Sequence, residues 1–306
     1  MAVYTKLSES EIANIVSNYN IGRLISFKGI EQGIENSNYL IVTEQAKFIL
    51  TIFEQRVKVD EIPFFIALTS HLKRAGINCP DTVVDKQGHK IQDIRGKKAV
   101  LISFLEGQGV EKIEDIHIQK LGEKVAKMHV AVGDFILTRA NDMALTKWVK
   151  LFESVAPMVD EIKPGLQKFI GDKIYELAAK WPFGLPSGII HADIFPDNVF
   201  FKDNEISGVI DFYFACSDQF AYDIAIIFNA WGIETDTRRQ KIFLDSYNNV
   251  RQLSAEEMAA LPTLLQGAAL RFLMTRLYDW FNTPKDAVVK KKDPMEYVRK
   301  LEALSK

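Results

Sequence analysis

Short β-rich runs are concentrated in the first third of the chain, and apolar residues at helical spacing dominate the rest. Short β-rich or continuous apolar runs predict strands at residues 21–27, 38–43, 47–53, 82–84 and 99–105. Apolar residues at helical spacing predict helices at residues 8–19, 61–72, 116–132, 148–159, 165–180, 221–231, 239–248, 255–280 and 294–306. We therefore predict an α+β protein with two lobes. The first is a small antiparallel-sheet lobe at residues 1–105, and the second is a mostly helical lobe at residues 106–306.

A polar stretch between two apolar runs carries the clearest chemistry of the sequence. His191, Asp193 and Asn198 form the pattern H-x-D-x-x-x-x-N, and a further apolar run ends at Asp211. A hairpin of strands would bring Asp193, Asn198 and Asp211 near one another. A carboxylate can orient an acceptor hydroxyl and take its proton, while an amide oxygen and a second carboxylate suit Mg²⁺. The pattern predicts a phosphoryl-transfer site. A metal-dependent hydrolase is disfavoured, because no further His or carboxylate cluster has metal-ligand spacing.

Composition and charge narrow the classes of partner. The chain has 306 residues, 47% of them hydrophobic and 25% charged, which is ordinary for a globular protein. With 38 basic and 40 acidic residues the net charge is −2, so we expect neither a nucleic-acid nor a membrane-surface partner. Cys79 and Cys216 fit reduced thiols, and we find no secretion signal and no run long enough to span a membrane. We expect a cytoplasmic protein; monomer and homodimer both remain open.

Residues 28–38 join the first two predicted strands and contain Gly29 and Gly33. Such a loop can lie over a nucleotide, with its backbone N–H groups close to the phosphates. Two glycines four residues apart also occur in many ordinary hairpins, so this pattern alone favours the ordinary hairpin. A histidine at the end of a predicted helix, His129, is more typical of a hydrogen-bonded structural residue than of a ligand.

Several motifs resemble a known superfamily. The stretch from His191 to Asn198, followed by Ile210-Asp211-Phe212, resembles the aminoglycoside phosphotransferase and choline kinase superfamily, which has a two-lobed protein-kinase-like fold. The blocks at residues 33–39, 50–54, 209–215 and 267–272 are similar to the type II homoserine kinases. The resemblance covers nearly the whole chain. It implies ATP- and Mg²⁺-dependent phosphorylation of the L-homoserine hydroxyl, a step of threonine biosynthesis.

The resemblance also implies roles for individual residues. Asp193 would be the catalytic base in contact with the substrate, Asn198 and Asp211 the magnesium ligands, and Asp223 a buried support of the hairpin. The nucleotide would be bound by a phosphate loop and by a hinge strand, whose candidate residues are Gly29, Gly33, Asn36, Ser37, Asn38, Ser103, Phe104 and Leu105.

One position departs from the superfamily pattern. The third strand usually carries a Lys or Arg that reaches the α and β phosphates and pairs with a helix glutamate. Here Thr51 takes that place, and its hydroxyl can donate a hydrogen bond but brings no charge. Either Lys47 or Arg56 supplies the cation, or magnesium and backbone amides suffice, and Glu61, the expected helix glutamate, lacks an obvious partner.

The acceptor site is the least constrained. Arg271 and Arg276 lie in an apolar helix, and a guanidinium fork suits a carboxylate. Taken alone, such residues more often form interhelical salt bridges; the resemblance favours Arg271 as a substrate ligand. Tyr213, two residues after Asp211, would line the acceptor pocket. Two alternatives stay open: a phosphotransferase for hydroxylysine, choline or an aminoglycoside, and a nucleotide-binding pseudokinase, which the threonine at position 51 would fit.

Overall fold

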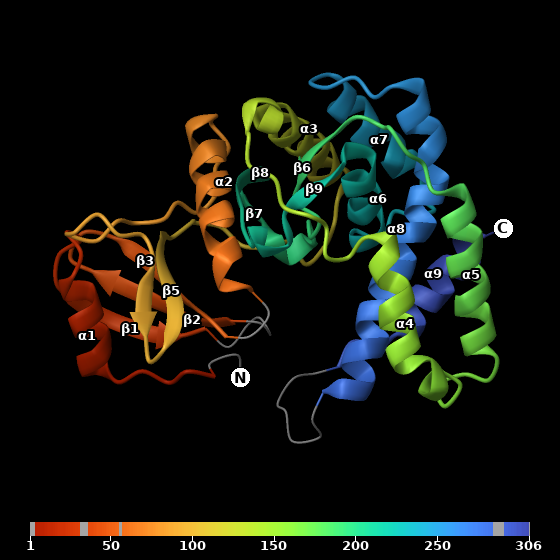
Figure 1. The fold of residues 1–306 in the computed structure, drawn as a ribbon. Coiled ribbons are helices and arrows are strands. Elements are labelled where there is room, and N and C mark those ends of the chain that lie inside the picture. Colours follow the sequence, from red (N-terminus) through yellow and green to blue (C-terminus); the bar gives the residue numbers. More distant parts are fainter. Residues whose placement is uncertain (1–3, 31–35, 55–56, 284–290, 306) are drawn as a thin grey trace. The chain divides into compact units, whose positions relative to one another are not determined.

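The computed structural model describes residues 4–30, 36–54, 57–283 and 291–305. The chain divides into two compact units, which we describe separately (Figure 1). Unit 1 comprises Met1–Gly107 and Ser207–Tyr213; unit 2 comprises Gln108–Ile206 and Phe214–Lys306. The chain passes from unit 2 into unit 1 within β8 (Glu205–Val209) and returns after Tyr213.

Unit 1 is built on a five-stranded sheet with the order β1-β2-β3-β5-β4 and antiparallel neighbours. Its strands are β1 (Leu24–Gly29), β2 (Asn36–Thr43), β3 (Lys47–Phe53), β4 (Gln92–Ile94) and β5 (Lys97–Ser103). In this register Thr51 lies between Asn38 on β2 and Val100 on β5. Because successive side chains of a strand point to opposite faces of the sheet, neighbouring residues of β3 contact different helices.

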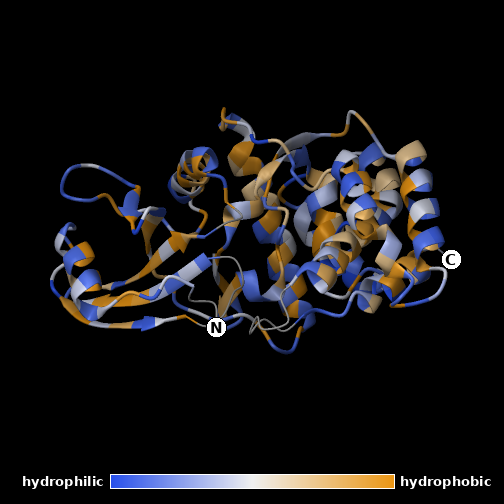
Figure 2. Ribbon diagram, turned by 60° about the horizontal axis from the view of Figure 1, so that its bottom comes forward, coloured by the Kyte–Doolittle hydropathy of each residue, from blue (hydrophilic) through white to orange (hydrophobic). Residues whose placement is uncertain are grey.

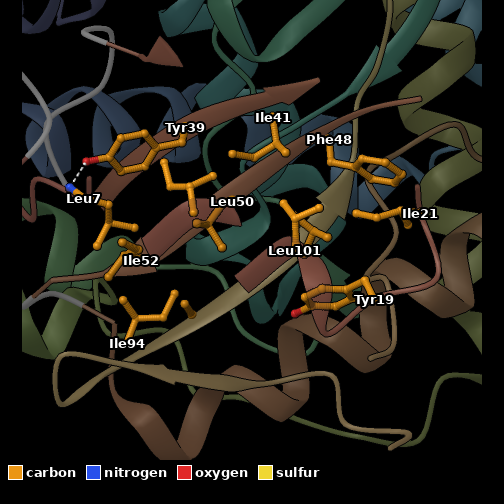
Figure 3. Packing of buried hydrophobic residues seen from close by; sticks show 13 residues of the cluster. Leu7, Tyr19, Ile21, Tyr39, Ile41, Phe48, Leu50, Ile52, Ile94 and Leu101 are labelled. Carbon is orange, nitrogen blue, oxygen red and sulfur yellow. Dashed lines mark hydrogen bonds between the residues drawn. The ribbon is translucent and has the colours of Figure 1, made fainter. Parts of the chain in front are cut away.

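One face of the sheet is covered by α1 (Glu9–Ser17). Ser8 and Glu11 form a reciprocal capping box that starts this helix. Figure 3 shows the resulting core, in which Leu50 and Leu101 lie among buried apolar side chains and the Tyr39 hydroxyl accepts a hydrogen bond from the Leu7 N–H. The chain ahead of α1 is thereby fastened to β2.

The other face of the sheet meets α2 (Ile62–Arg74). Ile62 and Ile66 of this helix pack with Phe53 and Val100, and the ring of Tyr213 joins the same cluster. Because Thr51 alternates with Leu50 and Ile52 of the opposite core, its side chain lies on this α2 face.

Unit 2 is mostly helical. Figure 2 shows hydrophobic and hydrophilic residues interspersed along its helices, as expected for amphipathic helices around a core. Ten residues of α6 are buried, so this helix is the centre of the unit. Its helices are α3 (Asp115–Ala131), α4 (Leu145–Val159), α5 (Leu166–Lys180), α6 (Phe220–Ala230), α7 (Thr237–Asn248), α8 (Ala255–Asn282) and α9 (Met295–Leu304).

A short antiparallel pair of strands places the polar loop of unit 2. Strand β6 (Ser187–Ile190) pairs with β9 (Cys216–Gln219), and Ile190 lies opposite Cys216. The loop from residue 191 leaves the end of β6, and a turn of 3-10 helix at Pro196–Asn198 leads into β7 (Val199–Lys202). The start of α6 follows β9 directly, so its first turn lies next to this loop.

The structure confirms the predicted α+β class, with a small antiparallel sheet and a mostly helical second half. The strand predicted at residues 82–84 is only a single bridge between Thr82 and Ile102, and the fifth strand is β4 instead. Within the described ranges no helix has the length and hydropathy that a membrane crossing requires. Cys79 and Cys216 are both buried free thiols.

Candidate active site

The loop that follows β6 holds Asp193 in a fixed backbone setting. Ala192, just before it, has a φ of 64°, which lies in the left-handed region. This conformation costs energy for a non-glycine residue and persists only where the surrounding contacts maintain it. The Phe195 N–H donates to the carbonyl oxygen of Asp193 over 2.9 Å. The Asn198 N–H in turn donates to the carbonyl of Phe195 over 2.9 Å. The loop is therefore a defined turn that presents the Asp193 carboxylate.

Asn198 is bound to the same turn through its side chain. Its amide nitrogen donates to the Asp193 carbonyl over 2.8 Å and approaches the Asp193 carboxylate at 3.3 Å. The amide oxygen thus points away from Asp193 and keeps its lone pairs for another group. Such an oxygen is a suitable ligand for a hard cation.

A buried carboxylate, Asp223 on α6, supports the loop from behind. Its side chain accepts hydrogen bonds from the Ala192 N–H at 2.8 Å, the His191 N–H at 3.2 Å and the His129 ring at 3.1 Å. Burial acts to raise the pKa of Asp223, but the His129 hydrogen bond, the nearby histidine charges and the Ala192 N–H outweigh it, and the pKa is lowered. Asp223 therefore stays ionised and holds the loop backbone, as the sequence implied.

The support continues as a chain of buried polar groups. The other ring nitrogen of His129 lies 2.8 Å from the Tyr247 hydroxyl, and Arg251 donates to that hydroxyl over 3.1 Å. Arg251 also pairs with the almost fully buried Glu257 at 2.9 Å. Since a carboxylate only accepts, His129 carries a proton on the nitrogen that faces Asp223. His129 is thus a structural residue, as predicted from its place at the helix end.

Arg271 lies beneath the loop rather than on the surface. Its side chain is only 3% exposed and donates to the Ala192 carbonyl over 2.7 Å. The guanidinium lies against the rings of Phe272 and Phe214, 4.8 and 6.0 Å from their centres. This geometry favours Arg271 as a support of the Ala192 turn and makes direct contact with a substrate carboxylate less favourable.

Arg276 is held by the chain that leads into α9. It forms an ion pair with Glu296 at 2.7 Å and donates to the Asp293 carbonyl over 2.8 Å. Its guanidinium also lies 4.4 Å from the centre of the Tyr297 ring. Arg276 therefore connects α8 to α9 and to the segment before it. Such an interhelical ion pair is what the residue type and its position alone led us to expect.

In unit 1, the candidate phosphate loop joins β1 and β2. Gly29 ends β1 opposite Tyr39, and the Ile30 N–H donates to the Asn38 carbonyl over 2.8 Å; Gly33 lies outside the described residues. Asn36 and Ser37 are buried, and the Ser37 hydroxyl accepts from the N–H groups of Tyr4 and Thr5 at 2.8 and 3.0 Å. The side chains of Asn36 and Ser37, which follow the loop, therefore face the protein interior.

The carboxylate of Glu54 completes this attachment. It accepts hydrogen bonds from the hydroxyls of Ser37 and Thr5 at 2.5 and 2.8 Å and pairs with Lys97 on β5. Burial tends to raise the pKa of Glu54, but the Lys97 and hydroxyl hydrogen bonds lower it overall. No local sequence pattern marks this cluster, because its members come from four separate segments.

Thr51 forms a neutral network where related kinases place a charge. Its hydroxyl donates to the Asn38 side-chain oxygen over 2.8 Å, and it also hydrogen bonds the Tyr213 hydroxyl. The Tyr213 ring packs edge-on against Phe53 and Phe65, with centroids 5.2 and 5.6 Å apart. Burial and the charge of nearby Asp211 raise the pKa of Tyr213, so its hydroxyl stays protonated. Tyr213 therefore fastens the turn after β8 to the sheet of unit 1.

Asp211 lies on that turn with a φ of 64°, another left-handed non-glycine residue. It belongs to unit 1, whereas Asp193 and Asn198 belong to unit 2. Among the described residues no three His, Cys, Asp or Glu side chains gather into a metal-binding group. A Mg²⁺ site here would therefore need nucleotide phosphates or water as further ligands, which is the usual mode for this ion in kinases.

The remaining candidates of unit 1 have protein partners as well. Lys47 pairs with Glu106 at 3.4 Å, Glu61 pairs with Lys58 at 3.1 Å, and Arg56 lies outside the described residues. In the candidate hinge, the Ser103 and Phe104 N–H groups donate to the carbonyls of Asp81 and Lys47. Leu105 follows and is buried.

Comparison with known proteins shows the family to which the chain belongs. A model of the phosphotransferase enzyme family matches residues 26–261, more than half of the chain. A homoserine kinase from Rhodopseudomonas palustris is 49% identical over 98% of this chain and 94% of that protein. A homoserine kinase from Paramagnetospirillum magneticum is 48% identical over 98% of this chain and 95% of that protein.

Solved structures show the same fold at low identity. An amicoumacin kinase has a TM-score of 0.76 and 16% identity, with 97% of this chain and 92% of that chain covered. A spectinomycin phosphotransferase has a TM-score of 0.73 and 12% identity, with 98% and 95% covered. At such identities the likeness is one of fold alone.

Proposed function

The chain belongs to the phosphotransferase enzyme family and to its homoserine kinases, and on that premise we propose that it transfers the γ-phosphoryl group of ATP to the side-chain hydroxyl of L-homoserine. The products are ADP and O-phospho-L-homoserine, so the enzyme serves threonine biosynthesis. The observation that carries the assignment is identity of nearly half over almost the full length of homoserine kinases. The loop with Asp193 and Asn198 in place supports it.

Asp193 is the catalytic base of this proposal. The homoserine hydroxyl oxygen attacks the γ-phosphorus, the bond from that phosphorus to the β,γ-bridging oxygen breaks, and the hydroxyl proton passes to Asp193. The support from Asp223 and Arg271 fixes the backbone on both sides of Ala192, which holds the carboxylate in one place. Such positioning is the main contribution that a protein makes to phosphoryl transfer.

Asn198 and Asp211 supply oxygen atoms, so their chemistry fits Mg²⁺. We propose that they bind the ion with the β and γ phosphates, where it would neutralise charge that develops on the phosphate oxygens. The turn that carries Asp211 is fixed by Tyr213 through Thr51. We therefore propose Tyr213 as a positioning residue for the metal ligand, because its side chain packs against Phe53 and Phe65 of unit 1.

The nucleotide site is proposed on backbone groups. The loop between Gly29 and Asn38 would approach the phosphates with its N–H groups, while Ser37, Asn38 and Thr51 hold its base through their side chains. In the hinge, Leu105 offers the N–H next to those of Ser103 and Phe104, which already have partners. Since Thr51 brings no charge, magnesium and these amides would neutralise the phosphates.

We also propose a cytoplasmic location, which the two free thiols Cys79 and Cys216 support because such thiols are typical of a reducing compartment. The partner is a small molecule, in keeping with the homoserine kinases that the chain resembles.

An acceptor panel tests the function. ADP release is measured with saturating ATP and Mg²⁺ and one acceptor at a time: L-homoserine, hydroxylysine, choline and an aminoglycoside. We expect the highest kcat/KM with homoserine. Preference for another acceptor would overturn the substrate assignment, and no turnover with any of them would favour a nucleotide-binding pseudokinase.

A further inference from the structure

A lysine from the segment before α9 contacts the loop that carries the catalytic base. The ammonium of Lys292 is 5.4 Å from the centre of the Phe195 ring, and Phe195 is two residues after Asp193. The Phe195 ring packs edge-on against Phe272 of α8, with centroids 5.1 Å apart. Its backbone N–H donates to the Asp193 carbonyl. Phe195 is therefore fixed from both sides, and so is the place at which Lys292 meets the loop.

The backbone around Lys292 is fixed as well. Lys291, just before it, donates to the Trp280 carbonyl over 2.6 Å, and Arg276 donates to the carbonyl of Asp293, just after it. The Asp293 carboxylate then caps the N-terminus of α9 through the Met295 N–H. Helices α8 and α9 pack side by side (Figure 1), so these contacts hold residues 291–293 against unit 2. A lysine on such a segment is presented in a set direction.

The charges nearby distinguish Lys292 from other cations. Arg276 is paired with Glu296, Arg299 lies 3.3 Å from Asp293, and Lys300 pairs with Glu234 at 2.8 Å. Lys292 is exposed, and its ammonium contacts the Phe195 ring. Across the ranges that the structure describes, Lys292 forms no ion pair. An exposed cation–π contact is weak, about 0.5–1 kcal/mol, so the ammonium keeps most of its capacity to bind an anion.

We propose that Lys292 binds the carboxylate of homoserine and so selects amino-acid acceptors over simple amino alcohols. The inference rests on the proposed function, because it assigns the acceptor of that reaction. In homoserine, three carbon atoms separate the hydroxyl oxygen from the carboxyl carbon, so a substrate whose hydroxyl faces Asp193 carries its carboxylate close by. Lys292 is the exposed, unpaired cation that contacts this loop in the described ranges. Of the sequence-based candidates, Arg276 is ion-paired with Glu296, and Arg271 is buried beneath the loop, where it donates to the Ala192 carbonyl while its Nε has no hydrogen-bond partner among the described residues.

The test compares two acceptors that differ by one group. 3-Aminopropan-1-ol is homoserine without its carboxylate, so Lys292 has nothing to bind in it. In Lys292→Met we expect kcat/KM for homoserine to fall about 10- to 100-fold, because a hydrogen-bonded charge pair is lost. The kcat/KM for 3-aminopropan-1-ol and the KM for ATP should stay near those of the wild type. Lys168→Met, which removes an exposed lysine of α5, is the control for net charge and should leave both acceptors unchanged.

A second measurement needs no turnover of the poorer acceptor. L-2-Aminobutyrate has the carboxylate but no hydroxyl, and its inhibition constant against homoserine should rise in Lys292→Met by the same factor. Propylamine, which lacks both groups, should inhibit both proteins equally. Equal loss with both acceptors, or an unchanged homoserine preference in the variant, would overturn the assignment of Lys292. If the wild-type protein fails to phosphorylate homoserine at all, the proposed function itself is wrong, so the two failures are distinguishable.

Discussion

The buried carboxylate behind the loop offers the sharpest test of how the active site is held. Replacing Asp223 by Asn removes one acceptor oxygen and puts an N–H₂ group in its place. The three groups that face this side chain, the N–H groups of His191 and Ala192 and the ring of His129, are donors at 2.8 to 3.2 Å. The asparagine side chain has a single acceptor oxygen, which can accept hydrogen bonds on one side only. Its N–H₂ group must therefore face one of these donors on the other side.

The magnitude follows from these contacts. A hydrogen bond to a charged group is worth about 1.5–3 kcal/mol, and leaving one buried donor unpaired costs about 1–3 kcal/mol. The Asp223→Asn change should therefore destabilise the protein by about 3 kcal/mol, and kcat should fall with it because the backbone before Asp193 is loosened. The KM for ATP should change less than kcat.

The matched control is Asp218→Asn on β9. Burial raises the pKa of Asp218, with Asn141 and the Gln219 N–H as partners. Both partners of Asp218 are donors, as at Asp223, but burial disfavours the charge of Asp218, so removing that charge offsets part of the lost hydrogen bonding and the cost should be smaller than at Asp223. Thermal unfolding and kcat are measured for both variants beside the wild type. Equal effects of the two substitutions would refute the reasoning.

The same pair gives opposite dependences on pH. The pKa of Asp223 is lowered in the fold, so its contribution to stability is present above the unfolded-state pKa and is lost as the pH falls through the folded one. The pKa of Asp218 is raised, so its contribution is present at low pH and is lost as the pH rises through the folded value. Relative to the wild type, Asp223→Asn should be least damaging in acid, and Asp218→Asn should be less damaging at neutral pH than in acid. A pH series of unfolding midpoints checks both signs.

Three further predictions concern unit 1 and the metal. Tyr213→Phe removes the hydrogen bond to Thr51, so the Mg²⁺ concentration at half-maximal rate should rise about fivefold, as expected for a loss of about 1 kcal/mol; an unchanged Mg²⁺ titration would contradict this role. Glu54→Gln weakens the attachment of Ser37 and Lys97, so the KM for ATP should rise while the KM for homoserine stays constant, as steady-state kinetics would show. Chelation of Mg²⁺ should abolish turnover and its return should restore it; full activity in EDTA would exclude the proposed ligands.

Local patterns predicted the elements of the fold well. The helix predicted at residues 8–19 corresponds to α1, and the apolar stretch at residues 255–280 corresponds to α8. The failures were short strands: residues 82–84 form only a bridge at Thr82, whereas β4 arises because residues 92–94 pair with β5. Pairing over such short stretches depends on neighbouring strands and not on the segment's own sequence.

The site was predictable where its residues share one motif. Asp193 and Asn198 are joined by hydrogen bonds, as their spacing suggested. The contacts that hold the loop were beyond the sequence, since His129 and Tyr247 are 118 residues apart and show no common pattern. Helical spacing correctly placed Arg271 in an apolar helix. It could not predict that Arg271 donates to the Ala192 carbonyl, because the two residues are far apart in the sequence.

The central claim is that Asp193 activates the hydroxyl of homoserine toward ATP. The most direct measurement follows the phosphorus NMR spectrum of ATP, Mg²⁺ and L-homoserine with the wild-type enzyme and with Asp193→Asn. We expect a phosphomonoester signal of O-phospho-L-homoserine that grows in step with ADP for the wild type, and almost none for the variant, although the variant still binds ATP. Inorganic phosphate as the only product of the wild type, or phosphohomoserine formed by Asp193→Asn at the wild-type rate, would contradict it.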